Sequence, residues 1–381
     1  MTDRIYLDWN ATTPLRAETK RAMADALELV GNPSSVHAEG RAARKLVEDA
    51  RHEVARTVGV DAASVVFTSG GTEANTTALQ PLLQAARAAA PVARLIVSTI
   101  EHPSVLAGGR FDAAKIELAP VTPEGLIDLD ALRALLIGQA PALVSVMLAN
   151  NETGVIQPIR AIADLVHGAG GVLHVDAVQA LGKIALDVPA LGADLVSVSA
   201  HKLGGPKGVG ALIHASREVQ GLMPLIRGGG QERGHRGGTE NVIGIAGFGA
   251  AIAAARAGLA DEERRQATLQ RRLEDGLSQR SNVLIFSKMA PRLPNTTLFC
   301  APGARADTAL MALDLAGIAV SAGAACSSGK VQSSHVLKAM GVPVEIGQGA
   351  LRLSCGWTTT ESDIDCYLEA WRKLSGVLLK P

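Results

Sequence analysis

The sequence predicts an α/β protein built around a largely parallel β-sheet. Short runs rich in β-branched residues alternate with longer runs of helical spacing, and glycine-containing turns separate them. Helical spacing is clearest at 41–58 and 160–168, where small apolar residues interleave with charges. Strand-like runs occupy 64–68, 95–99, 143–148, 172–176, 195–199 and 209–213. Such alternation is typical of β–α–β units, whose strands lie parallel in one sheet.

The length of the chain indicates two domains. With 381 residues it exceeds the size at which one hydrophobic core usually stops growing. Hydrophobic residues make up 47% and aromatic residues only 3%, so Ala, Val, Leu and Ile must fill the cores. After about residue 255 the alternation stops, and a charged amphipathic helix at 256–280 is followed by shorter elements. We predict a large domain over 15–255 and a small domain formed by 1–14 and 256–381.

The charge balance argues against several classes of partner. The chain has 37 basic and 37 acidic residues, so no basic field favours nucleic acid or an anionic membrane. The first residues, MTDRIYLDWNATTP, carry charge early and do not form a signal peptide. The longest uncharged stretch, 134–151, contains Pro141 and two Asn and makes a poor membrane span. We therefore expect a cytoplasmic protein that binds neither nucleic acid nor membrane.

The four cysteines are Cys300, Cys326, Cys355 and Cys366. They form no C-x-x-C pair and the chain has no H-E-x-x-H, which argues against a disulfide framework or a self-contained zinc site. Cys326 lies among small residues in SAGAACSSGK, where an accessible thiolate could act as a nucleophile. We expect Cys300 and Cys366 to be packing residues.

The segment SVSAHKLGGPKG, at 197–208, is the strongest chemical signal. A buried-looking strand ends there in Ser-x-His-Lys and runs into glycines. A lysine at the end of a core strand is costly unless it is paired or neutralised. Schiff-base formation between Lys202 and a carbonyl cofactor would neutralise it. The alternative is a solvated lysine in a glycine-rich turn.

Asp176 and Gln179, in HVDAVQALGK, favour the cofactor interpretation. Asp176 closes an apolar run and Gln179 follows it closely. Pyridoxal 5′-phosphate (PLP) needs a carboxylate beside its pyridine nitrogen, because the protonated ring is a better electron sink. Gln179 could supply a donor near the ring hydroxyl. The alternative role of Asp176 is a helix N-cap.

Other polar residues follow predicted strands. Gly71 and Thr72, in TSGGTEAN, open a helix whose N-terminus suits a phosphate, although the same turn could be only a capped helix start. His102 follows the run at 95–99 and could lie over a flat ring and move protons, or be structural. Asn151 follows the run at 143–148. The carboxyl ends of parallel strands meet at one sheet edge, where α/β folds bind ligands.

Two arginine-containing segments remain. The loop at 227–241 resembles an RGG tract, but it is brief and contains Glu232 and Glu240, so a second phosphate contact across a dimer interface is favoured over RNA binding. Arg352, in RLSCG, could bind a substrate carboxylate through two hydrogen bonds, or be a surface arginine.

Taken together, these segments resemble the class V aminotransferase superfamily of PLP enzymes, and more closely the cysteine desulfurases of the NifS/IscS type. The resemblance runs nearly from end to end. Its blocks occur in the family's order: LDWNATTP, GNPSSVHAEG, FTSGGTEAN, EHPSV, NNETGV, HVDAVQALGK, SAHKLGGPKG, GGGQERGHRGGTEN, SAGAACSS and LRLS. It departs at Gly71, where many members carry Ala, and after Cys326, where Ser replaces the frequent Thr.

The resemblance implies a mostly parallel seven-stranded sheet sandwiched by helices, with a smaller α+β domain. It also implies a role for each candidate residue. Lys202 would carry PLP as a Schiff base, Asp176 would face the pyridine nitrogen, Gln179 the ring oxygen, and His102 would stack on the ring and transfer protons. The phosphate would be held by Gly71, Thr72, Ser199 and His201, with Thr239 reaching in from the partner subunit of a homodimer. Asn151 would contact both the cofactor and, with Arg352, the carboxylate of the substrate.

The activity implied is the conversion of L-cysteine to L-alanine, with a persulfide formed on Cys326 in a mobile loop at about 321–335. The sulfur would pass to a scaffold protein for iron–sulfur cluster assembly or to another acceptor. Whether Cys326 also becomes a transient iron–sulfur ligand shared with that scaffold is left open. The alternatives are a selenocysteine lyase, another PLP enzyme of this fold such as an aminotransferase, and a non-catalytic relative. A serine hydrolase is poorly supported, because the chain has no G-x-S-x-G.

Overall fold

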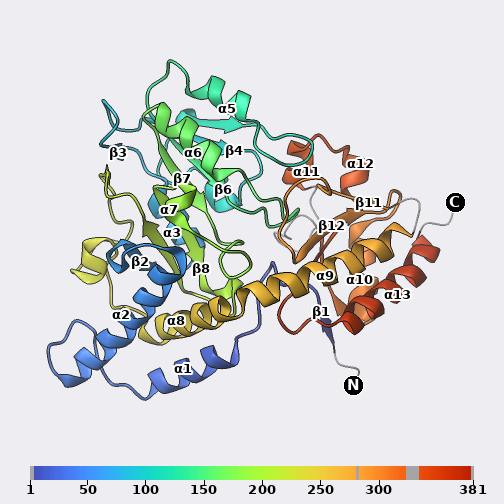
Figure 1. Cartoon of the computed structure of the whole chain (residues 1–381), viewed down its shortest axis with the longest axis horizontal. Coiled ribbons are helices and arrows are strands. Elements are labelled where there is room, and N and C mark those ends of the chain that lie inside the picture. Colours follow the sequence, from blue (N-terminus) through green and yellow to red (C-terminus); the bar gives the residue numbers. More distant parts are fainter. Residues whose placement is uncertain (1–3, 280–282, 323–333, 379–381) are drawn as a thin grey trace.

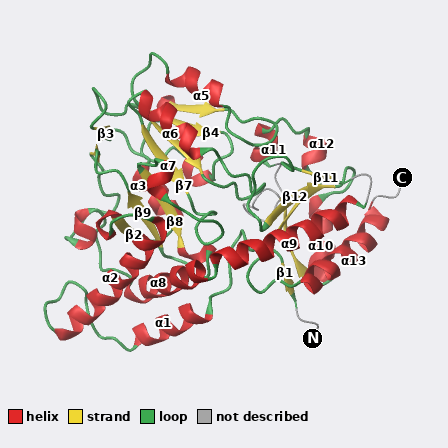
Figure 2. Cartoon of the chain, in the orientation of Figure 1, coloured by secondary structure: helices red, strands yellow, loops and turns green. Residues whose placement is uncertain are grey.

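The computed structural model describes residues 4–279, 283–322 and 334–378, and a seven-stranded sheet dominates it (Figures 1 and 2). The strand order is β2 (Val65–Thr68), β9 (Gly210–His214), β8 (Leu195–Ser199), β7 (Val172–Asp176), β6 (Ala142–Met147), β4 (Arg94–Ser98) and β5 (Ile116–Ala119). All pairs from β8 to β5 are parallel, and β9 runs antiparallel to β8 and β2. The predicted α/β class with a mostly parallel seven-stranded sheet is confirmed.

Helices cover both faces of this sheet, which explains why its central strands are continuous apolar runs rather than alternating ones. Every residue of β4, β6, β7 and β8 is buried. One face packs against α2 (Ala38–Val58), α5 (Leu129–Leu136), α6 (Ile159–Gly168) and α8 (Val242–Ala257). The other face packs against α3 (Gly71–Ala78) and α4 (Pro103–Leu106). The remaining elements of this part are the helices α1 (Ala17–Leu27) and α7 (Val188–Leu191) and the antiparallel strands β3 (Gln84–Ala85) and β10 (Val219–Gln220).

A second, antiparallel sheet has the order β11 (Leu284–Ile285), β12 (Thr296–Cys300), β15 (Ala350–Ser354) and β14 (Ser321–Ala322). It shares a core with α9 (Leu259–Ser278), α10 (Ala306–Leu315) and α13 (Glu361–Leu378), built around Phe299, Tyr367 and Trp371. Two short helices, α11 (His335–Ala339) and α12 (Val344–Gly347), lie beside β12 in Figure 1. The second sheet with its helices forms the smaller α+β part of the molecule.

The helix predicted at 256–280 starts later than expected. The chain completes α8 at Ala257, breaks at Gly258 and continues as α9 from Leu259, with an angle of 71° between the two helices. Glycine weakens a helix interior, which accounts for the break. Over the described ranges no single helix is long and apolar enough to cross a membrane, and this bent pair passes such a test by length and composition only.

The N-terminal segment joins the two sheets. Its strand β1 (Ile5–Tyr6) pairs in parallel with β13 (Ile318–Ala319). Further along, Ser354 N donates to the Leu7 carbonyl at 2.9 Å, and Thr13 N donates to the His201 carbonyl at 3.0 Å. Residues 7–13 therefore run from β15 of the small sheet to the end of β8 in the large one. The predicted domain limits at 14 and 255 stay a prediction.

Trp9 anchors this segment. It is 2% exposed, its ring meets Trp357 edge to face at a centroid distance of 4.6 Å, and its indole N–H donates to the Tyr6 carbonyl at 2.9 Å. Gly356 provides the space for the ring, because a Cβ at that position would lie 1.9 Å from Trp9 Cε3. The ring and the glycine therefore fit together only in the absence of a side chain at 356.

We predict that Gly356→Ala displaces Trp9 and lowers the free energy of unfolding by about 1–3 kcal/mol, the usual cost of overpacking. Urea unfolding followed by tryptophan fluorescence measures the change. The matched control is Gly376→Ala in α13, where nothing lies within 4 Å of the new Cβ. Equal urea midpoints for the two variants would show that the Trp9 contact is dispensable.

Candidate active site

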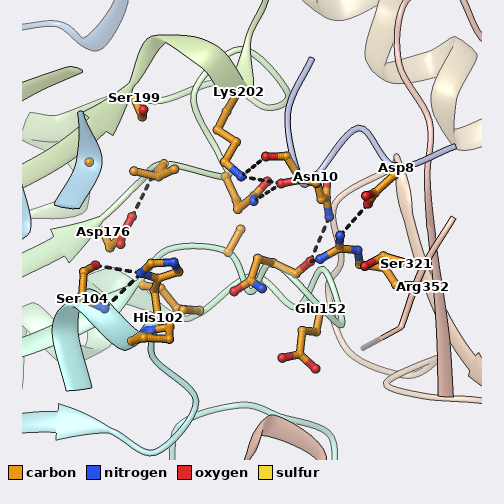
Figure 3. A pocket seen from close by; sticks show the side chains of 18 of the residues that line it. Asp8, Asn10, His102, Ser104, Glu152, Asp176, Ser199, Lys202, Ser321 and Arg352 are labelled. Atoms are coloured by element: carbon orange, nitrogen blue, oxygen red, sulfur yellow. Dashed lines mark hydrogen bonds and ion pairs between the residues drawn. The ribbon is translucent and has the colours of Figure 1, made fainter. Parts of the chain in front are cut away.

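A cavity of about 830 Å³ opens at the carboxyl ends of β6, β7 and β8, between the two sheets (Figure 3). Every predicted site residue in the described ranges lines it except Thr239: Gly71, Thr72, His102, Asn151, Asp176, Gln179, Ser199, His201, Lys202 and Arg352. The small sheet contributes Ser321 and Ala322, and the N-terminal segment contributes Asp8, Asn10 and Ala11. Residues that lie far apart in the chain thus form one pocket.

Lys202 ends the short helical turn that follows β8. Its Nζ donates to the carbonyl oxygens of Asn10 at 2.5 Å and Ala11 at 2.8 Å. Burial is the main cause that lowers the pKa of Lys202 to about 8; the charge of Arg352 adds to the effect, and Asp8 and Asp176 oppose it. An amine with this pKa is partly uncharged near neutral pH, as a nucleophilic lysine must be.

Asp176, the last residue of β7, is buried and held by two donors. Asn75 Nδ2 donates to Oδ2 at 2.8 Å, and the Val178 N–H donates to Oδ1 at 3.0 Å. Both hydrogen bonds stabilise the charged carboxylate. Asn75 comes from α3 and was missed from the sequence, although it lies one helical turn after Gly71 in the same motif. The N-cap alternative for Asp176 is not needed, since no helix begins at residue 177.

His102 is the N-cap of α4. Its Nδ1 accepts from the Ser104 N–H at 3.1 Å and lies 2.8 Å from Ser104 Oγ, which itself accepts from Asn75 Nδ2 at 2.9 Å. Because Nδ1 is an acceptor, the neutral ring carries its proton on Nε2. Burial lowers the pKa of His102; Asp176 opposes this shift, and Lys202 and His335 add to it. His102 is therefore suited to exchange protons as a neutral base.

The proposed phosphate end of the pocket is formed by the N-terminus of α3 and the turn after β8. A Cβ at Gly71 would lie 2.8 Å from Val178 Cγ2, so the glycine allows the start of α3 to approach Val178 closely. Burial and the nearby charge of Lys202 lower the pKa of His201 to about 4. His201 is thus neutral at pH 7, and its Nδ1 lies 3.1 Å from Thr12 Oγ1.

Arg352 enters from the opposite side, on β15, and Figure 3 shows it beside Asp8 and across the cavity from His102. It is only 4% exposed, so the alternative of a surface arginine is wrong. Nη2 donates to Asp8 Oδ1 at 2.6 Å and Nη1 to the Asn151 carbonyl at 2.9 Å. Nε is buried and has no hydrogen-bond partner in the part of the chain that the structure describes. The guanidinium is fixed in place and keeps an unused donor.

One predicted residue of the described ranges does not line the pocket, and one other lies outside those ranges. Thr239 is exposed in the loop at 227–241 and does not line the cavity. That loop is anchored by Glu232, whose carboxylate accepts from both terminal nitrogens of buried Arg51 at 2.7 and 2.8 Å. Cys326 lies outside the described residues, so the structure neither supports nor contradicts its predicted role or its predicted cluster ligation.

The other three thiols are poor nucleophiles for this pocket. Burial raises the pKa of Cys300 to about 11 and that of Cys355 to about 12. Cys366 is exposed on α13, so its expected packing role is wrong: its neighbours Ile364 and Tyr367 face the core instead. In the part of the chain that the structure describes, no three His, Cys, Asp or Glu side chains are grouped to hold a metal ion.

Comparison with known proteins agrees with the family resemblance of the sequence. The family model described as Aminotransferase class-V matches residues 5–367. A curated relative from Cereibacter sphaeroides, named cysteine desulfurase, is 45% identical over 375 residues, which is 96% of this chain and 94% of the relative.

Solved structures agree in fold. The NifS-like protein from Rickettsia africae superposes with a TM-score of 0.88 at 36% identity, covering 98% of this chain and 99% of the other. The structure described as SspA in complex with cysteine superposes with a TM-score of 0.76 at 28% identity, covering 92% and 98%.

We predict that Lys202 reacts faster than exposed lysines with limiting formaldehyde and cyanoborohydride at pH 7. A pKa near 8 leaves roughly one-tenth of the amine uncharged at that pH, against roughly one part in several thousand for an ordinary lysine. Peptide mass spectrometry measures methylation at each position, and exposed Lys45 is the internal control. Equal rates at Lys202 and Lys45 would contradict the lowered pKa.

Proposed function

Because this chain belongs to the aminotransferase class-V family, we propose that it is a PLP-dependent cysteine desulfurase that converts L-cysteine to L-alanine and transfers the sulfur to Cys326. One observation carries the proposal: Lys202, Asp176, His102 and Arg352, contributed by four separate segments, line one cavity. The high identity to curated cysteine desulfurases along nearly the whole chain supports it.

The residues present fit PLP. Lys202 supplies an amine of lowered pKa to hold the aldehyde, Asp176 a carboxylate fixed by Asn75, and the start of α3 the backbone N–H groups for a phosphate. Among the described residues, buried Asn75 Oδ1 has no hydrogen-bond partner, as expected for a residue that faces a ligand. When bound, PLP supplies an electron sink for the charge that develops at the α-carbon of the substrate.

Arg352 is the best candidate to bind the carboxylate of cysteine. Two of its nitrogens are held by Asp8 and Asn151, while Nε remains free for a further acceptor. A guanidinium fixed by its neighbours loses little conformational entropy when it binds a carboxylate. The similar structure described with bound cysteine makes cysteine the expected ligand for this side of the pocket.

His102 and Lys202 are the groups suited to move the α-proton. Both have pKa values below their ordinary ranges, so both are partly uncharged near neutral pH and can accept a proton. The Ser104 hydrogen bonds fix the His102 ring, and the carbonyl groups of Asn10 and Ala11 position Lys202 Nζ.

Sulfur transfer requires a thiolate that reaches the substrate. The Cys326 thiolate would attack the substrate sulfur: an S–S bond forms, the C–S bond breaks with its electron pair left on carbon, and protonation of that carbon yields alanine. Cys300 and Cys355 have raised pKa values in buried positions, and Cys366 does not line the pocket. Cys326 is the remaining candidate.

Three further features belong to the same proposal. The chain acts as a homodimer in which Thr239 of one subunit reaches the phosphate site of the other, since the loop at 227–241 is anchored yet exposed. The persulfide passes to a scaffold protein or another sulfur acceptor. The protein works in the cytoplasm.

Selenocysteine is the second candidate substrate, because the same residues would act on it.

The main test is to supply L-cysteine, a thiol reductant and PLP, and to quantify alanine and sulfide together. We expect equal amounts of both from the parent protein. Cys326→Ala should keep the yellow absorbance of the bound cofactor yet release no sulfide, and Cys366→Ala is the matched control. Full activity of Cys326→Ala would remove this residue from the mechanism, and a protein that never takes up PLP would overturn the proposal.

We predict that Arg352→Gln lowers kcat/KM for cysteine roughly 10- to 100-fold, mainly through KM, because a hydrogen bond to a charged carboxylate is lost. The PLP absorbance should be retained. Arg305→Gln, at an exposed arginine that pairs with the nearby Asp307, is the control. An unchanged KM for Arg352→Gln would place the carboxylate elsewhere.

A further inference from the structure

A second lysine, Lys183, lies buried under the pocket without an anionic partner. It is 7% exposed, and its Nζ donates to Asn10 Oδ1 at 2.7 Å and to Gln179 Oε1 at 2.6 Å. No carboxylate of the described residues lies within ion-pair distance of it. Burial and the charges of Lys202 and Arg352 lower the pKa of Lys183 well below its ordinary value. A buried amine without a counter-ion is costly to keep, so it points to a function.

The direction of these hydrogen bonds is fixed by their neighbours. Asn10 Nδ2 donates to the Asn151 carbonyl at 3.1 Å and to Thr296 Oγ1 at 2.9 Å. A backbone carbonyl can only accept, so the Asn10 amide must turn its oxygen toward Lys183. Lys183 therefore donates to Asn10, and even an uncharged amine has a second N–H for Gln179.

The same reasoning orients the Gln179 amide. Its oxygen accepts from Lys183, and its Nε2 donates to the Asn10 carbonyl at 2.9 Å. An amide nitrogen carries two N–H groups, and Gln179 lines the cavity. One N–H is thus left for an acceptor oxygen of a ligand in the pocket.

We propose that Lys183 is a positioning residue that fixes the Gln179 amide with its N–H toward the ring oxygen of the cofactor. The inference rests on the proposed function and concerns a residue that does not line the pocket. Without Lys183, only the hydrogen bond from Nε2 to the Asn10 carbonyl holds the amide in this orientation, and an amide that turns over places its oxygen against the ring oxygen. Two oxygen atoms with lone pairs then face each other, and the ring oxygen must bind a proton to relieve the repulsion.

The consequence can be measured as the pH at which the colour of the cofactor-loaded protein changes. An N–H donor stabilises the deprotonated ring oxygen and lowers that pH. The other charged groups around Lys183, Lys202 and His201 are Arg352, Asp8, Asp176 and Lys207. All of them except Lys207 are retained in every variant below, so they do not account for a difference between Lys183 variants and the parent.

The test is Lys183→Met, which keeps a long unbranched side chain, one atom shorter than that of lysine, and removes its donors. In the PLP-loaded protein we expect the midpoint of the absorbance titration to rise by about one pH unit and the dissociation constant of PLP to increase roughly tenfold, as for a lost hydrogen bond in a buried site. Lys207→Met removes a lysine at an exposed position near the same site and should leave both quantities unchanged.

A double variant separates positioning from a general structural effect. In the Gln179→Leu background, Lys183→Met should produce no further rise, because the amide it acts through is gone. If Lys183→Met does not fold, Lys183→Gln, whose polar side chain is also one atom shorter than that of lysine, is measured instead, and a smaller rise in the same direction is expected. A parent-like titration of the Lys183 variant, or an equal rise in both backgrounds, would overturn the inference.

The controls distinguish this failure from failure of the proposed function. If the parent protein takes up PLP and forms alanine while the Lys183 variant titrates like the parent, only the positioning role is lost. If the parent takes up no PLP, the proposed function itself fails.

Discussion

Asn10 forms hydrogen bonds with polar groups from both sheets. Its backbone N–H donates to Ser354 Oγ of β15, its side chain contacts Thr296 of β12, and its carbonyl accepts from Lys202 and Gln179 of the large sheet's loops. It is 1% exposed, so none of these groups can exchange its partner for water. These groups of both sheets therefore depend on one residue, and the segment that carries it must lie between the sheets before the pocket has its shape.

This dependence explains why Trp9 and Gly356 matter for chemistry although neither lines the cavity. The indole fills the space left by the absent Cβ of Gly356, and its ring fixes the direction in which the chain enters the pocket. A shift of Trp9 would move the Asn10 carbonyl and with it Lys202 Nζ, which it accepts from at 2.5 Å. A change in the packing of the small α+β part would therefore change the position of Lys202 near the end of β8.

The sequence allowed the fold and most of the pocket to be predicted because the relevant signals are local. The runs at 172–176 and 195–199 are strands over those same residues, and the polar residues at or just after their ends meet at one sheet edge as parallel strands require. Asn75, Ser104 and Lys183 were missed as site residues because their roles come from contacts between segments. From the sequence alone, Lys183 looks like an ordinary turn residue, because its partner Asn10 lies 173 positions away in the chain.

Charge is the remaining constraint on what the pocket can bind. Lys202, Lys183 and Arg352 approach the cavity, while Asp8 and Asp176 are the acidic side chains whose charges act on Lys202. Asp8 is paired with Arg352 and Asp176 with the amide of Asn75, so neither compensates Lys183. Burial is the main cause of the lowered pKa of both lysines, and the neighbouring cations lower it further. Ligands that together carry a phosphate and a carboxylate would reduce the repulsion between these cations at two separate places. That requirement is met by a phosphorylated cofactor together with a substrate that carries a carboxylate, and it is not met by a substrate without an anionic group.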